Sequence, residues 1–165
     1  MHPNNLSILQ EVNGSGAWFA AHKVVPVWVR RVVVPETVSS LEGELLAKPG
    51  DFVCLGVAGE HWVQTEATLR AKYGESGRSS LDERGVEWTE FVPLPEGAGV
   101  MAARVHHDFV VHTSWGVLSG KPGDYLLKKL GDREVEFPGD IWVVDQTLFE
   151  TSYQSLEDRR DVSQG

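Results

Sequence analysis

The sequence predicts a β-rich α+β protein made of two tandem copies of one module that share a core. The segments KPGDFVCLGVAGEHWVQTEATLRAKY (48–73) and KPGDYLLKKLGDREVEFPGDIWVVDQTLFETSY (121–153) have the same order of features. Each runs from a Lys-Pro-Gly-Asp turn through an apolar stretch, a Gly-acid turn and a Trp-Val pair to a final Tyr. Such repetition indicates a repeated structural unit. The valine-rich run KVVPVWVRRVVV (23–34) favours strand, and an apolar share of 41% is enough for a core.

Each copy is expected to contain a strand, a turn, a hairpin and a short helix. In the Lys-Pro-Gly-Asp turn, proline presets φ at position i+1 and glycine supplies the positive φ of a type II turn at i+2. The runs FVCLGV and YLLKKL then predict strands, with HWVQ and IWVV as their hairpin partners. Thr65 and Asp145 are favoured N-caps for the helices that follow. Leu69 and Tyr73 stand four residues apart in the first helix, which places them on one face.

Four regions are expected along the chain. They are a first module with its N-terminal strand (1–80), a connector with one possible strand (81–99), a second module (100–153) and a flexible tail (154–165). Gly, Ser, Pro and charged residues at both ends of the connector indicate loops, and the tail has almost no apolar content. The stretch PETVSSLEGELLA (35–47) is expected to form a short turn or helix before the first Lys-Pro-Gly-Asp turn.

A set of proline, glycine, acidic and aromatic positions follows a known family pattern. In the first copy these positions are Pro49, Gly50, Asp51, Phe52, Gly56, Gly59, Glu60, Leu69 and Tyr73. They resemble, without a gap, the PGDYG-type family of small bacterial and prophage-encoded proteins. In the second copy the matching positions are Pro122, Gly123, Asp124, Tyr125, Phe149 and Tyr153, whereas Lys128 or Lys129 stands where the final glycine of PGDYG belongs. The resemblance covers about half the chain. It implies a small soluble module, often of mobile genetic elements, and brings no catalytic residue with it.

Charge and composition narrow the classes of function. Fifteen Lys and Arg against 24 Asp and Glu give a net charge of −9, which disfavours general binding to nucleic acid or anionic lipid. The sequence has no apolar stretch of membrane-spanning length and no signal-peptide pattern, so we expect a cytoplasmic protein that is not in the membrane. The single cysteine, Cys54, lies in an apolar run and is expected to be a buried small hydrophobe in a reducing compartment.

The segment ARVHHDFVVHTSWG (103–116) is the main candidate for chemistry. If it forms a strand, alternation places His106, Asp108 and His112 on one face. Two imidazoles and a carboxylate on one face can bind a divalent metal or act as acid and base. The favoured interpretation is that they are half-exposed strand residues facing solvent, because isolated motifs rarely form sites. No cofactor is therefore expected, and a divalent metal is the alternative.

Trp115 follows the same segment and is the main candidate for ligand binding. It stands before a turn, where an aromatic side chain can form the wall of a site for a planar ligand. Thr113 and His107, on the other face of the expected strand, are the further candidate binding residues. Packing in the core is nevertheless the favoured interpretation for Trp115, and the ligand site is the alternative. Asp51 and Asp124 are expected to accept backbone N–H groups and lock their turns rather than act as paired catalytic carboxylates.

The features together favour a small binding or adaptor protein of prophage or mobile-element origin that is not an enzyme. Its partner would be a protein or a small-molecule ligand, bound at the cleft between the modules or at a strand edge. Valine-rich edges also allow two chains to pair as a homodimer. The alternative is a small hydrolase-like enzyme that uses His106, Asp108 and His112, with or without a metal. A third hypothesis is an acidic regulator that mimics nucleic acid, which the even spread of charge weakens.

Overall fold

The computed structural model describes residues 1–95 and 97–156, and it divides into two compact units. Residues 24–98 form one, here called the middle unit. Residues 1–23 and the chain from residue 99 onward form the other, here called the terminal unit. With 45% of residues in strands and 20% in helices, the β-rich α+β prediction is confirmed. Most of the expected tail, residues 157–165, lies outside the described residues.

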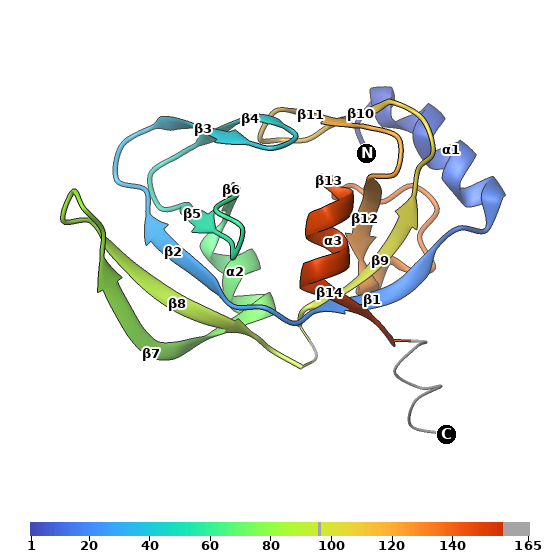
Figure 1. The fold of residues 1–165 in the computed structure, drawn as a ribbon. Coiled ribbons are helices and arrows are strands. Elements are labelled where there is room, and N and C mark those ends of the chain that lie inside the picture. The colour runs from blue at the N-terminus through green and yellow to red at the C-terminus, as the bar shows by residue number, and fades with distance from the viewer. Residues whose placement is uncertain (96, 157–165) are drawn as a thin grey trace, which may run out of the picture. The chain divides into compact units, whose positions relative to one another are not determined.

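The middle unit contains one five-stranded antiparallel sheet, a hairpin and a helix (Figure 1). Its sheet has the order β6-β5-β2-β8-β7. The strands are β2 (Val27–Arg31), β3 (Glu36–Ser40), β4 (Gly43–Ala47), β5 (Phe52–Leu55), β6 (His61–Gln64), β7 (Tyr73–Leu81) and β8 (Glu87–Pro93), and the helix is α2 (Glu66–Lys72). Side chains of β2, β5 and β8 pack with Leu69 of α2 in a buried cluster, with Trp62 against it, so α2 covers one face of the sheet.

The terminal unit also contains a five-stranded antiparallel sheet, with the order β13-β12-β9-β1-β14. Its strands are β1 (Phe19–Lys23), β9 (Gly99–Arg104), β10 (Phe109–His112), β11 (Val117–Gly120), β12 (Tyr125–Lys129), β13 (Ile141–Val144) and β14 (Tyr153–Ser155). Its helices are η1 (Pro3–Asn5), α1 (Leu6–Ser15), η2 (Leu130–Asp132) and α3 (Gln146–Ser152). The sheet and α3 enclose a cluster that includes Tyr125, Leu127 and Phe149, with Trp142 against it.

The two sheets follow the same path except at one strand. In both, a first strand (β2 or β9) leads through a hairpin (β3–β4 or β10–β11) to the next two strands, then to a helix and to an edge strand. The fifth strand differs in origin: β8 follows β7 along the chain, whereas β1 comes from the N-terminal part. β1 pairs within the terminal unit, and the next strand along the chain is β2 of the middle unit. β8 pairs within the middle unit, and the next strand along the chain is β9 of the terminal unit.

Two stretches differ from the sequence expectation. The stretch 35–47, expected as a turn or helix, contains the hairpin β3–β4, because Val38, Leu45 and Ala47 alternate toward a buried side. The expected connector 81–99 contains β8, which lies inside the middle sheet between β2 and β7. β8 therefore belongs to the middle unit. β1, which was expected in the first module, belongs to the terminal unit.

The two Lys-Pro-Gly-Asp turns have the predicted geometry. In the first, the Asp51 N–H donates to the Lys48 carbonyl at 3.0 Å, and the Asp51 carboxylate accepts the Lys48 N–H at 2.8 Å. The turn at residues 121–124 has the same two bonds, at 3.0 and 2.8 Å. Gly50 and Gly123 have φ of 92° and 98°, the region that favours glycine. The prediction of aspartates that lock their turns is confirmed.

The helix caps are also as predicted. The Thr65 hydroxyl accepts the Thr68 N–H at 3.1 Å, and the Asp145 carboxylate accepts the Leu148 N–H at 3.1 Å. Each bond satisfies one of the free N–H groups of the first helical turn. Cys54 is buried in the middle unit, as expected. The expectation of one core common to both copies concerns the placement of the two units and stays a prediction.

Candidate functional site

The histidine-bearing segment is not a continuous strand. β9 ends at Arg104 and β10 begins at Phe109, so His106 and Asp108 lie in the bend between the two strands and His112 lies at the end of β10. The expected alternation therefore does not place these three side chains on one strand face. Within residues 1–95 and 97–156, no group of three or more His, Cys, Asp or Glu is placed to hold a metal ion.

His107 interacts with the N-terminal helix. Its Nε2 atom lies 2.6 Å from the Glu11 carboxylate of α1, and its Nδ1 atom lies 2.8 Å from the backbone oxygen of Asp108. The hydrogen bond to Glu11 raises the pKa of His107 most, followed by the bond to the Asp108 carbonyl. The contact joins the bend before β10 to α1. His107 thus has a partner on α1, the Glu11 carboxylate.

His112 and the N-terminal residues contact each other in two ways. The imidazole rings of His2 and His112 stack with centroids 4.7 Å apart. The Asn5 side chain accepts the His112 N–H and donates to the His112 carbonyl, both at 2.8 Å. Because Asn5 is only 3% exposed, these bonds are shielded from water. They hold the first residues of the chain against β10.

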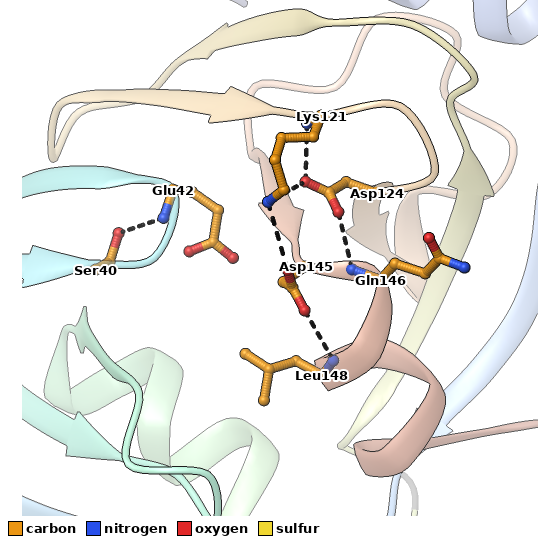
Figure 2. A network of polar contacts seen from close by, with 7 residues as sticks. All are labelled: Ser40, Glu42, Lys121, Asp124, Asp145, Gln146 and Leu148. Atoms are coloured by element: carbon orange, nitrogen blue, oxygen red, sulfur yellow. Dashed lines mark hydrogen bonds and ion pairs between the residues drawn. The ribbon is translucent and has the colours of Figure 1, made fainter.

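Thr113 and Trp115 belong to the turn of the β10–β11 hairpin. The Thr113 hydroxyl accepts the N–H groups of Trp115 and Gly116, each at 3.1 Å, and donates to the Gly116 carbonyl at 2.8 Å. In β3–β4, Ser40 makes the same kind of turn, and Figure 2 shows its bond to the Glu42 N–H. The structure therefore gives Thr113 a turn-closing role, and Trp115 is half-buried in that turn.

A network of polar contacts joins the second Lys-Pro-Gly-Asp turn to α3 (Figure 2). One Asp124 oxygen accepts the Lys121 N–H, and the other accepts the Gln146 N–H at the start of α3 at 2.9 Å. The Lys121 ammonium lies 3.4 Å from Asp124 and 3.5 Å from Asp145, and Asp124 contributes most to the raised pKa of Lys121. Asp124 is 2% exposed, so its carboxylate serves to support the turn and the start of α3.

A pocket of about 360 Å³ lies in the middle unit, on the sheet face that α2 partly covers. Its floor is formed by the buried side chains of Val29, Phe52 and Phe91. Charged side chains also line it: Arg30, Arg31, Arg70, Glu75 and Glu87. Val86 and, in β8, Thr89, which pairs with Val29, complete the lining. Half of its lining residues are charged, so this pocket is more polar than most sites for small molecules.

The terminal unit has a larger side chain at the place that matches this pocket. Residues paired across each sheet form rows that can be matched between the units. The row at the pocket contains Thr89, Val29, Cys54 and Trp62, and the row in the same place of the other sheet contains Phe19, Ala102, Leu127 and Trp142. The Phe19 ring packs edge-on against Tyr125 at 6.2 Å and Phe149 at 5.9 Å. A threonine at this position leaves space that a phenylalanine occupies.

Two arginines are held over the aromatic residues of the floor. The Arg31 guanidinium lies 4.8 Å from the Phe52 ring centroid, and the Arg70 guanidinium lies 5.6 Å from that of Phe91. Both donate to the same oxygen of Glu66, at 3.2 and 3.1 Å. Arg70 lowers the pKa of Glu66 most, and Arg31 adds to the effect. Stacking and ion pairing together hold both cations at the edge of the pocket.

The residues of this pocket share no local motif, so the pocket cannot be found from the sequence. They come from β2, β5, α2, β7 and β8, which are distant along the chain. One signal was present in the duplicated segments. At the same place in the two helices, the first copy has Arg70 and the second has Glu150, which reverses the charge. This difference gives α2 and α3 opposite charges at matching positions.

Further properties of the whole chain add little about function. Among the residues that the structure describes, no helix is both long enough and apolar enough to cross a membrane. Comparison of the chain with protein-family models, curated proteins and solved structures gives no match. The PGDYG-type resemblance therefore stays a prediction made from the residues that carry it.

Proposed function

We propose that this chain is a non-catalytic binding protein made of two copies of one α+β module, and that the middle unit binds a small molecule in the pocket beside Thr89. One observation carries the proposal. At matching places in two sheets of the same strand order, β8 has Thr89 and an open pocket, whereas β1 has Phe19 packed against two aromatic rings. The duplicated scaffold therefore differs at the place where a ligand would enter.

Similar local geometry in the two units supports the duplication. The strand orders correspond, both Lys-Pro-Gly-Asp turns have the same pair of hydrogen bonds, and both helices have a side-chain cap. Trp62 and Trp142 pack against the buried cluster of their own units. Agreement at turns, caps and core positions is expected when two copies of one module diverge after duplication.

The pocket has the size of a small-molecule site. Its volume of about 360 Å³ is at the lower end of the range for small ligands. Val29 and Phe91 are each 1% exposed, so they form a floor that is fixed by the core of the unit. The charged side chains around this floor would select the polar groups of a ligand.

Thr89→Phe is expected to abolish ligand binding. The larger side chain would occupy the space beside Val29 in which a ligand would lie. A library of small fragments would be screened against the full chain by thermal shift and by ligand-observed NMR. Compounds that raise the melting temperature of the wild-type protein are expected to have no effect on Thr89→Phe, while the variant itself stays folded.

Thr89→Val is the matched control, because valine has nearly the shape of threonine and leaves the pocket open. It is expected to bind the same compounds as the wild-type protein. Two results would refute the proposal: a screen in which nothing binds the wild-type chain, or hits that bind Thr89→Phe as tightly as the wild type.

A further inference from the structure

We infer that the ligand of this pocket carries an anionic group, a carboxylate or a phosphate, that binds between Arg31 and Arg70. The rest of the ligand is apolar or aromatic and lies in the same pocket, beside Thr89. The inference depends on the proposed function, because it names the chemistry of the ligand that the same pocket would take.

The two arginines have more hydrogen-bond donors than their partner can satisfy. Each guanidinium has five N–H donors, and a carboxylate has only two oxygens to accept them. Here both guanidinium groups donate to one and the same oxygen of Glu66. The Arg31 and Arg70 side chains are 50% and 48% exposed, so their remaining donors are accessible to an added oxyanion.

The positions of the two guanidinium groups are fixed before a ligand arrives. Arg31 lies over the Phe52 ring, and Arg70 over the Phe91 ring. A guanidinium that rests with its carbon over an aromatic ring keeps its N–H edges free for hydrogen bonds. Because Phe52 and Phe91 are buried, the rings act as rigid supports. Preorganised donors lose less entropy on binding, and arginine pairs well with carboxylate and phosphate.

The acidic residues of the pocket restrict the rest of the ligand. Glu75 and Glu87 also line the pocket, and Glu75 lies 3.9 Å from Arg70. A second negative charge on the ligand would be repelled by these carboxylates. We therefore expect one anionic end at the arginines and a neutral or cationic remainder.

The terminal unit has a different arrangement of charge at the same place. Arg104 pairs with Tyr125 across its sheet as Arg31 pairs with Phe52. At the position of Arg70, however, α3 has Glu150, and at that of Glu66 it has Gln146. The pair of arginines is thus particular to the middle unit, which also has the open pocket.

Titration of the full chain with four related compounds tests the inference. Benzoate and phenyl phosphate supply the two anions on an aromatic ring, while benzyl alcohol and benzylamine are the neutral and cationic counterparts. Calorimetry is expected to show binding of at least one of the two anions, tighter by about tenfold or more than that of the alcohol or the amine. Preference between the two anions identifies a carboxylate or a phosphate as the natural group.

Substitutions at the ion-pair cluster provide the second arm. Arg70→Gln and Arg31→Gln are each expected to lower the affinity for the anion about tenfold or more. Arg70→Lys is expected to lower it less. Glu66→Gln is expected to strengthen it, since the built-in carboxylate no longer competes for the arginines. Glu150→Gln on α3 is the matched control and should leave affinity unchanged. Thermal melting of each variant shows whether it is folded.

The outcomes separate this inference from the proposed function. If the alcohol or the amine binds as tightly as the anions and Arg70→Gln has no effect, the ligand is not anionic. The pocket would then be a site for a neutral or cationic ligand. The inference is also overturned if neither anion binds the wild-type chain. Failure of the proposed function itself would instead appear as fragment hits that are insensitive to Thr89→Phe.

Discussion

A fragment of residues 24–98 is expected to fold by itself, whereas a fragment of residues 1–80 is expected to stay unfolded. The first contains every strand of the middle sheet, including β8 between β2 and β7. The second lacks β8 and carries β1 without β9 and β14, its partners. Losing an inner strand leaves backbone groups of β2 and β7 without partners and removes Phe91 from the core.

The expected effect is large because such a loss exceeds the stability of a small domain, about 5–15 kcal/mol in total. Far-UV circular dichroism and the dispersion of amide signals in a ¹H–¹⁵N NMR spectrum of each fragment provide the measurement. The two fragments have nearly the same length, so chain length does not account for a difference between them. A cooperatively folded 1–80 fragment together with an unfolded 24–98 fragment would mean that the strand assignments to the two sheets are wrong.

Asp124→Ala is expected to destabilise the chain by about 2–4 kcal/mol, because it removes one buried carboxylate that serves several donors. The N–H groups of Lys121 and Gln146 both donate to Asp124, and the Lys121 ammonium lies close to it. Without the carboxylate, the turn is no longer tied to the start of α3 (Figure 2). Urea unfolding followed by circular dichroism gives the change in the free energy of unfolding.

Asp51→Ala is the matched substitution in the other turn. Asp51 is less buried than Asp124 and accepts the Lys48 N–H, so its loss is expected to cost about 1 kcal/mol. Asp124→Asn keeps the size of the side chain but has only one accepting oxygen. Its free energy of unfolding should fall between those of the wild type and Asp124→Ala. Equal destabilisation by the two alanine variants would show that the link to α3 contributes nothing beyond the turn.

Local chemistry made the turns, caps and hairpins predictable from the sequence. Proline followed by glycine determines φ at two successive positions, so the turn at residues 48–51 follows from four residues. Thr65 and Asp145 have side chains that compete for backbone N–H groups and therefore mark helix starts. The stretch 35–47 was wrongly expected as a turn or helix, since its strands depend on burial of Val38 and Leu45 rather than on local preference.

Long-range pairing could not be predicted in the same way. Nothing in the residues of β1 indicates that it pairs with β9 and β14 rather than with strands near it in sequence. The same holds for β8, which was expected within a connector. Both strands occupy inner places in their sheets, and such places are determined by contacts with distant segments of the chain.

The candidate site was predicted less well than the fold. The predicted alternation along residues 103–116 required an unbroken strand. The chain bends at His106 and His107, so the strand is interrupted there. The pocket depends on a row of paired residues across several strands, in which Thr89 matters because of its neighbours. Only after strand register is known can Thr89 be matched with Phe19, so the sequence alone gave no reason to compare them.

NMR mapping of a bound ligand on the ¹⁵N-labelled full chain would locate the site directly. Titration with benzoate or phenyl phosphate, whichever binds more tightly, is expected to shift the amide signals of Arg31, Glu87 and Thr89, which line the pocket. The signals of Phe19 and Ala102, at the matching row of the terminal unit, should stay in place. Shifts centred on that row, or saturation of binding without a change at Thr89, would mean that the open place in the middle unit is not where this protein binds.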